Sequence, residues 1–345
     1  MKKNIIKYTV SFLLAGVLVY FAFKGVDWGA FWEGLKQTRW GYVALFVAFS
    51  TMALVLREER WTALIRPFDP AVRRMDVWDS VNVGNLVNVV LPGAGEFVRC
   101  GYVSRRGISY DKALGTVVCE RTCDLVAIAL LFAGALIGSR DKFGSFFVEQ
   151  IWAPAAGGLN FSLWWIIAGV AILVGGGLWA VFHWSGSNKF CGKVAGWIRG
   201  LGAGFAGIAR MERKWVFVLQ TVGIWGAYVA MSWAGLKAVP MLAGLGWAEA
   251  LFISAVGNIA SVIPVPGGIG AYHYLVALTL QSLFSASWDT GILYATLCHE
   301  THAILIIVLG IISYFTFTVR RKSCKIAIFA SPFGSVAQLD RATAF

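Results

Sequence analysis

Charged side chains are scarce in this chain, and their scarcity excludes most soluble protein classes. Asp, Glu, Lys and Arg make up 14% of its 345 residues, whereas soluble domains average about 25%. Hydrophobic residues make up 58%, and the mean hydropathy is +0.69. Such a composition is typical of chains that cross a membrane several times. We therefore expect an all-α, polytopic membrane helix bundle that forms a single domain over residues 1–325.

Several chemical motifs are also missing. The sequence has no phosphate-binding P-loop, no dinucleotide-binding glycine pattern and no serine-nucleophile elbow. Its six cysteines show neither disulfide nor zinc spacing. We expect no cofactor and no ATP-driven transport within the chain. The net charge of +12 lies in loops between apolar runs, so it predicts membrane topology rather than a nucleic-acid partner.

Apolar runs alternate with polar segments along the chain. Residues 57–76 are expected to be a polar, arginine-rich loop, and 189–214 either an interfacial basic helix or a connector packed on the protein. Residues 326–345 should be a cytoplasmic tail, of which 335–345 resemble the translated product of a transfer-RNA gene; a frayed tail is the alternative. The expected spans are residues 5–23, 40–56, 113–138, 161–182, 215–236 and 291–319.

Two apolar segments contain a Pro-Gly break. Residues 84–99 are GNLVNVVLPGAGEFVR, and residues 257–273 are GNIASVIPVPGGIGAYH. Proline removes a backbone donor and glycine loosens the chain, so neither segment should be one continuous helix. Each is expected to be a re-entrant hairpin or a pair of short crossings, although two proline kinks in ordinary helices are the alternative. Paired breaks of this kind point to a transport site near the bilayer midplane.

The basic residues predict the orientation of these segments. Most of the 30 lysines and arginines fall in segments that face the cytoplasm if the amino terminus is inside. Both termini are then cytoplasmic. The first broken segment is entered from the cytoplasm and the second from outside, which predicts two repeats of inverted topology, over roughly residues 40–138 and 215–319.

Ionisable residues inside apolar spans indicate where a substrate binds, because an isolated charge is costly there. Arg121 and Asp124 are three residues apart, so they form either an internal ion pair or a guanidinium site for a phosphate with carboxylates around it. His299 and Glu300 are interpreted as a proton relay or a structural pair. A metal site is not expected, because His299 and His302 have the wrong spacing and no evident third ligand.

The asparagines of the broken segments could bind a headgroup or satisfy the interrupted backbone. No catalytic residue is assigned. The candidate substrate-binding residues are Asn85, Asn88, Pro92, Glu96, Arg99, Glu120, Arg121, Asp124, Asn258, Pro266, Gly267, Gly268, His273, His299 and Glu300.

Four elements together resemble a known family. They are LREERWTALI at residues 56–65, NVVLPGAGEFVR at 88–99, ERTCDL at 120–125 and PVPGGIGAYHYL at 264–275. This set is similar to the flippase-like membrane region of lysylphosphatidylglycerol synthases, and the resemblance extends to about residue 325. It implies a multi-pass protein of the bacterial inner membrane that moves a phospholipid or lipid-linked headgroup between leaflets. His273 stands where the pattern leads us to expect an acidic residue.

The resemblance implies membrane lipids as partners, in particular anionic or aminoacylated phospholipids. Because it covers the membrane region without the cytosolic synthase domain, we expect lipid translocation rather than aminoacyl transfer, and a transporter rather than an enzyme. The alternatives are an integral membrane transferase that modifies a lipid, with Glu120, Asp124, His299 and Glu300 as acid and base groups, and a non-catalytic partner in envelope-lipid assembly. A homo-oligomer is compatible with each of these.

Overall fold

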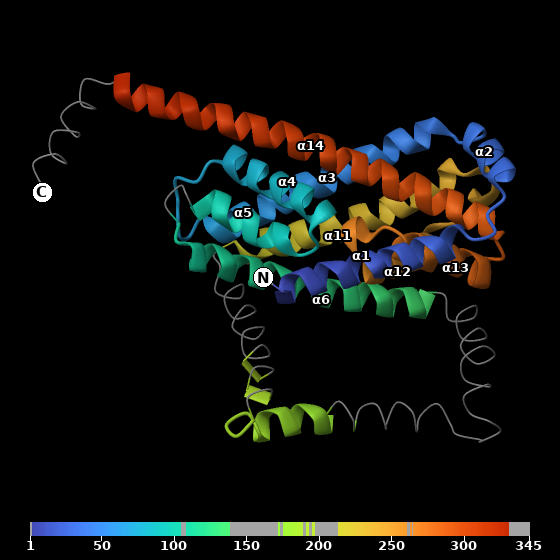
Figure 1. Cartoon of the computed structure of the whole chain (residues 1–345), viewed down its shortest axis with the longest axis horizontal. Helices are drawn as coiled ribbons and strands as arrows, with labels where there is room; N and C mark the ends of the chain where they lie inside the picture. Colours follow the sequence, from blue (N-terminus) through green and yellow to red (C-terminus); the bar gives the residue numbers. More distant parts are fainter. Residues whose placement is uncertain are drawn as a thin grey trace, which may run out of the picture.

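The computed structural model describes residues 2–104, 108–138, 213–260, 263 and 265–330, with short pieces between 172 and 196. The regular elements of these described residues are helices, and they lie roughly side by side (Figure 1). The span expected at 161–182, most of 189–214 and the segment 335–345 fall outside the described residues. In chain order the elements are α1 (Lys2–Phe23), α2 (Trp28–Lys36), α3 (Trp40–Ile65), α4 (Arg74–Val90), α5 (Ala94–Ser104), α6 (Tyr110–Gly138), α11 (Lys214–Ala238), η2 (Pro240–Leu242), α12 (Trp247–Ala260), η3 (Pro266–Gly268), α13 (Ala271–Phe284) and α14 (Trp288–Ala330).

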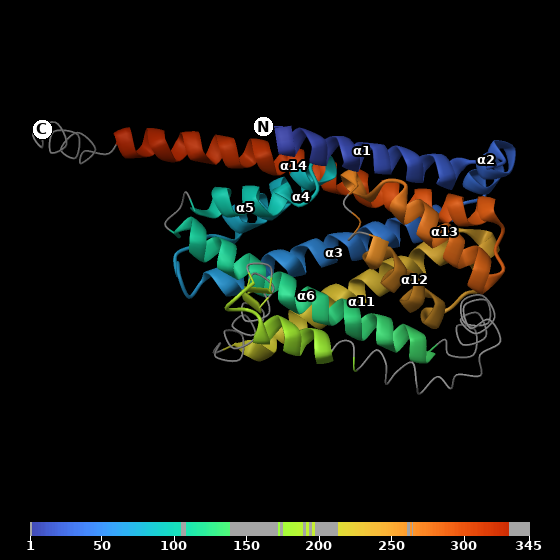
Figure 2. The same ribbon diagram turned by 60° about the horizontal axis from the view of Figure 1, so that its bottom comes forward.

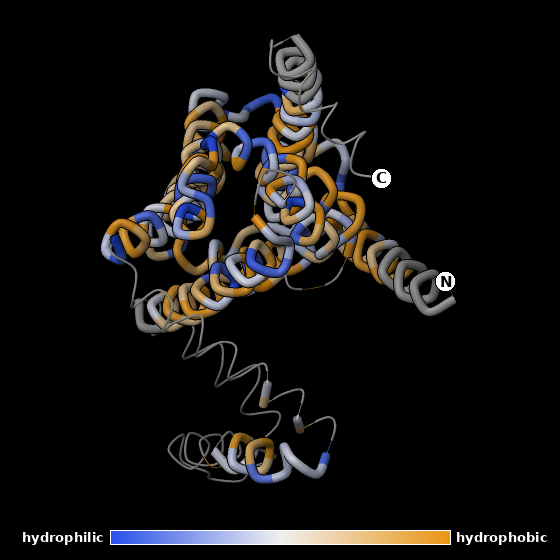
Figure 3. The backbone as a smooth tube through the Cα atoms, turned by 90° about the vertical axis from the view of Figure 1, so that its left-hand side faces the viewer, coloured by the Kyte–Doolittle hydropathy of each residue, from blue (hydrophilic) through white to orange (hydrophobic). Residues whose placement is uncertain are grey.

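Three of the described helices are long and apolar enough to cross a membrane: α3, α11 and the part of α14 from Trp288 to Arg320. A fourth candidate is the pair Leu13–Phe23 and Trp28–Lys36, which is bent by 82°. In the end-on view of Figure 3 much of the helix bundle has the colour of hydrophobic residues, and many large apolar side chains are exposed. Apolar surface on this scale is expected where the surrounding solvent is lipid.

The prediction of a polar loop at residues 57–76 is wrong for the first half of that stretch. Helix α3 continues to Ile65, and only residues 66–73 connect it to α4. Trp61, Leu64 and Ile65 keep the three-to-four-residue apolar spacing of a helix and are buried in a cluster with Val77 and Val81 of α4. The free energy gained by burying this apolar face outweighs the tendency of the many charged residues in this stretch to form an exposed loop.

Both Pro-Gly segments are interrupted, as predicted. The first ends α4 at Val90 and restarts as α5 at Ala94, with Gly93 at a φ of +77°. The second ends α12 at Ala260 and restarts as α13 at Ala271. Within that break Gly267, Gly268 and Gly270 have φ values of +60°, +76° and +83°. Only glycine adopts such angles without a steric penalty, so the glycines are what allow the chain to reverse.

The hairpin of α4 and α5 closes on two glycines and one asparagine. A Cβ atom on Gly95 would overlap the carbonyl oxygen of Gly84, and one on Gly84 would lie 2.9 Å from the carbonyl oxygen of Gly95. The Asn88 side chain accepts a hydrogen bond of 2.8 Å from the backbone N–H of Gly95. This bond satisfies one of the free donors at the start of α5. Asn88 therefore completes the broken backbone.

The two hairpins lie toward opposite ends of the bundle, and their tips meet between them. Helices α4 and α5 lie on the left of Figures 1 and 2, whereas α12 and α13 lie on the right. The tip element η3 packs against α4, where the Cβ position of Gly267 lies 3.5 Å from the carbonyl oxygen of Val89. Helices α3 and α11 pack together beside these tips. The described tip of the second break is thus packed against the helix that precedes the first break.

The close approach of Gly84 and Gly95 predicts a specific sensitivity to small substitutions. Replacing Gly95 by Ala should lower the melting temperature of the detergent-purified protein by roughly 5 °C or more, because the added methyl overpacks the hairpin. The control is Gly101→Ala on the same helix, where a Cβ would have no neighbour within 4 Å. Equal melting temperatures for the two variants would contradict this packing.

Candidate functional site

Seven ionisable side chains gather between α3, α5 and α6, within an otherwise apolar bundle. Four are arginines and three are carboxylates. We call this group the arginine–carboxylate cluster; its members are Arg57, Arg60, Glu96, Arg99, Glu120, Arg121 and Asp124.

The centre of the cluster is a set of short ion pairs. A terminal nitrogen of Arg60 lies 3.1 Å from Glu120 and 2.8 Å from Asp124. A terminal nitrogen of Arg99 lies 2.9 Å from the other oxygen of Glu120 and 2.6 Å from Glu96. Glu120 therefore bridges two arginines, one from α3 and one from α5. Its side chain is fully buried.

Arg121 closes these pairs into a ring. Its terminal nitrogens lie 2.8 Å from Glu96 and 3.3 Å from Asp124. Positive and negative groups then alternate around a cycle of three arginines and three carboxylates, so the ring has no net charge. Arg57 is the seventh member and stands outside the ring, 3.8 Å from Glu120. The cluster as a whole therefore carries one positive charge in excess.

The cluster is deeply buried at one side and open at the other. The side chain of Arg60 is fully buried and that of Arg99 is 4% exposed, whereas the side chain of Arg121 is 39% exposed. Breaking a buried pair costs about 3–5 kcal/mol because it leaves an uncompensated charge. The inner members therefore hold the three helices together, and the partly exposed Arg57 and Arg121 are the arginines that a ligand can reach.

Aromatic and hydroxyl groups support the arginines from neighbouring elements. The Arg99 guanidinium lies 4.5 Å from the centre of the Trp61 ring, and the indole N–H of Trp61 donates to the Thr116 hydroxyl at 2.9 Å. On α11, Thr221 accepts from Arg60 at 3.3 Å and the Tyr228 hydroxyl accepts from Arg57 at 3.4 Å. The second half of the chain therefore helps to position the cluster.

The sequence analysis missed Arg57 and Arg60, because it placed both in a loop. A signal was present: Arg57, Arg60 and Trp61 stand at positions i, i+3 and i+4, which is one face of a helix. Glu96, Arg99 and the charged residues of α6, which were selected from the sequence as candidate substrate-binding residues, lie together in this cluster. The sequence also allowed an internal ion pair between Arg121 and Asp124, which the structure contains.

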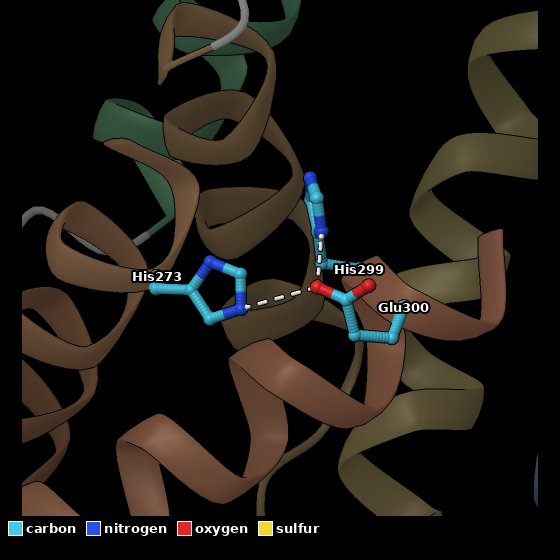
Figure 4. Close-up of side chains that lie close together, drawn as sticks. All are labelled: His273, His299 and Glu300. Carbon is cyan, nitrogen blue, oxygen red and sulfur yellow. Dashed lines mark hydrogen bonds and ion pairs between the residues drawn. The ribbon is translucent and has the colours of Figure 1, made fainter. Parts of the chain in front are cut away.

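A second polar group lies at the other hairpin. His273 from the first turn of α13 approaches His299 and Glu300 of α14, and Figure 4 shows one oxygen of Glu300 between the two imidazole rings. That oxygen lies 3.0 Å from Nδ1 of His299 and 3.7 Å from Nε2 of His273. Nε2 of His299 hydrogen-bonds the Gly267 carbonyl oxygen at 2.8 Å. We call His273, His299 and Glu300 the histidine–glutamate cluster.

The remaining candidate residues lie at the hairpin tips or within the helices that lead to them. Pro92 occupies the break after α4, and Pro266 and Gly268 begin and end η3. The Asn258 amide donates to the Ser254 carbonyl oxygen one turn earlier at 2.8 Å. Asn85 is half-buried on α4. The predicted set thus divides between two ionisable clusters and the hairpin tips that lie between them.

Comparison with known families agrees with this arrangement. The family model described as the lysylphosphatidylglycerol synthase TM region matches residues 5–310, which include both clusters and both breaks. The chain belongs to this family. No curated protein and no solved structure matches it. Membership of the lysylphosphatidylglycerol synthase TM region family, together with the apolar helices, identifies an integral membrane protein related to lipid modification or flipping.

Proposed function

We propose that this protein is a lipid flippase, which moves a phospholipid or lipid-linked headgroup between the leaflets of the bacterial inner membrane. The observation that carries the proposal is the arginine–carboxylate cluster, with four guanidinium groups against three carboxylates. The family supports a role in lipid modification or flipping but leaves the choice between them open.

The excess charge favours an anionic ligand. An uncompensated guanidinium within a membrane is costly, and a phosphate group offers the bidentate partner that this planar cation prefers. The Nε atoms of all four arginines are buried and have no hydrogen-bond partner among the described residues. The Nε N–H groups of the two partly exposed arginines, Arg57 and Arg121, are donors that a phosphate could satisfy. The headgroup of an anionic or aminoacylated phospholipid supplies such a phosphate.

Within the cluster we assign the phosphate contact to Arg57 and Arg121. Arg57 has the longest ion pair of the seven residues, and Arg121 has the most exposed side chain. The positive charges of Arg57 and Arg121 also repel each other, and an anion bound between them would reduce this repulsion. Glu96, whose side chain is 22% exposed, stands beside Arg121 and could receive a cationic aminoacyl group.

The packing of the helices supports the predicted inverted repeats. If α3 to α6 form one half and α11 to α14 the other, the contacts between elements come in matching pairs. Helix α4 packs on α14 as α12 packs on α6, and α5 packs on α6 as α13 packs on α14. Helices α3 and α11 pack on each other. Such reciprocal packing is expected of two halves related by a pseudo-two-fold axis, the arrangement found in many secondary transporters.

Contacts between loops that are far apart in the sequence support the proposal that the two hairpins enter the membrane from opposite sides. At one end Arg39 donates its backbone N–H to Ala238 at 2.9 Å, and Trp288 donates to Ala22 at 3.0 Å. At the other end the Lys112 ammonium lies 5.6 Å from the centre of the Phe68 ring. The second end carries Arg66 and Arg73 of the loop 66–73 and Arg74 at the start of α4, so we assign it to the cytoplasm, together with both termini.

Alternating exposure of the arginine–carboxylate cluster to the two sides of the membrane would carry the headgroup across while the acyl chains remain in lipid. The sequence has no nucleotide-binding motif, so movement would be downhill or driven by an ion gradient.

The proposal predicts that Arg121 is needed for leaflet exchange. In vesicles containing fluorescent phosphatidylglycerol, Arg121→Ala should slow protein-dependent exchange roughly tenfold or more, because a hydrogen bond to a charged group contributes about 1.5–3 kcal/mol. Exchange is measured as the fraction of fluorophore that an impermeant reductant bleaches over time. Arg57→Gln should show a similar loss.

The matched control is Arg74→Ala, which removes an arginine that is 58% exposed and paired with Glu59 at 2.8 Å. This variant should exchange lipid at the wild-type rate, and all variants should be compared at equal folded yield. Wild-type exchange by Arg121→Ala would contradict the assignment of the site. A change in the mass of the extracted lipid, without exchange, would instead favour a lipid-modifying transferase.

The proposed orientation predicts which loops are accessible from each side. In a cysteine-free background, Gly244→Cys should react with an impermeant thiol reagent added to intact spheroplasts, whereas Pro70→Cys should react only after permeabilisation. Both positions are exposed in loops at opposite ends of the bundle. Labelling of both from the same side would exclude the inverted arrangement.

A further inference from the structure

We propose that the histidine–glutamate cluster is a binding site for a divalent transition-metal ion of the zinc class. One nitrogen from each histidine and one oxygen of Glu300 all lie within 4.8 Å of one another. Two imidazoles and a carboxylate are a ligand set that zinc uses when it keeps a fourth position open. From the sequence no metal was expected, because His299 and His302 have the wrong spacing and no third ligand was evident. The structure instead brings His273 of α13 to His299 and Glu300 of α14.

The distances are close to those that a metal requires. Bonds of about 2.0–2.1 Å in a tetrahedral site place neighbouring ligand atoms about 3.3 Å apart. The Glu300 oxygen lies 3.0 Å from Nδ1 of His299 and 3.7 Å from Nε2 of His273. Small side-chain movements would therefore bring all three atoms onto one ion.

The hydrogen bond of His299 to the backbone favours the metal-binding tautomer. The Gly267 carbonyl oxygen can only accept, so Nε2 of His299 carries the hydrogen at the 2.8 Å contact. Metal-ligating histidines usually donate their other ring N–H to a carbonyl or carboxylate in this way. The lone pair of Nδ1 is then directed toward the Glu300 carboxylate, which is also an acceptor. Two acceptors at 3.0 Å need a cation between them.

A metal ion satisfies this cluster better than a single proton does. A proton shared by His299 and Glu300 would leave Nε2 of His273 at 3.7 Å from the carboxylate, which is beyond hydrogen-bond distance. An ion coordinated by all three groups would orient the His273 ring as well.

The burial of the three ligands suits a site with one open position. The side chains of His273 and His299 are 2% and 12% exposed, whereas that of Glu300 is 46% exposed. Water or a substrate oxygen can therefore reach the ion from the Glu300 side. Because His299 also holds the Gly267 carbonyl, a bound ion would fasten the tip of the second hairpin to α14.

The four histidines of the chain allow a controlled test. Protein purified on a streptavidin-binding tag, stripped with chelator and dialysed against micromolar Zn²⁺ should retain about one equivalent of zinc by elemental mass spectrometry. His273→Ala and His299→Ala should retain less than about one fifth of that amount. His183→Ala, which removes an exposed histidine, and His302→Gln, whose ring instead bonds the Ser50 hydroxyl at 2.6 Å, should bind like the wild type.

The wild type alone provides a second readout if a ligand variant fails to fold. Addition of Co²⁺ should give the visible absorption of a four-coordinate nitrogen and oxygen site, and Zn²⁺ should abolish it by displacement. Zinc retention unchanged in His273→Ala, or neither zinc retention nor a cobalt spectrum in the folded wild type, would overturn the proposal. In the latter case the cluster would hold a proton only. The test does not depend on lipid exchange, so it stands apart from the proposed flippase function.

Discussion

The ring of alternating charges is the interaction on which the first half of the bundle depends. It joins an arginine of α3, two residues of α5 and three residues of α6, so none of these helices can move without separating buried ions. In a low-dielectric surrounding the pairs compensate one another only if all are present. The ring is electrically neutral, which leaves Arg57 as the charge that the protein itself does not balance. Under the proposed function, this arrangement is stable when empty and its excess charge attracts an anionic headgroup.

The two halves of the chain have the same order of helices and breaks, but they place different ionisable residues after the break. In each half, a Pro-Gly break separates two helices, and the helix after the break brings an ionisable side chain against the next helix. Arg99 meets Glu120 in the first half, whereas His273 meets Glu300 in the second. Arginine retains its charge under all physiological conditions, but imidazole is a metal ligand and exchanges protons. The first cluster therefore suits a fixed anion site, and the second suits an exchangeable cation that could control the position of its hairpin.

Features set by local chemistry were predictable from the sequence, whereas features set by distant partners were not. The breaks near Pro92 and Pro266 follow from residues that cannot continue a helix. The helical extension that carries Arg57 and Arg60 depends on burial of Trp61 against other helices, and a run of charged residues concealed it. His273 and His299 are separated by most of α13 and the first turns of α14, so their spacing along the chain gave no sign of a shared site. The family resemblance found the correct segments without showing how their side chains are paired.

The most direct test of the central claim is native mass spectrometry of protein extracted gently from its membrane. The account predicts that the wild type retains a phospholipid with a phosphate-bearing headgroup, and that Arg121→Ala loses this lipid while remaining folded. Retention of the same lipid by both proteins, or exclusive retention of lipids without phosphate by the wild type, would show that the arginine–carboxylate cluster is not a headgroup site.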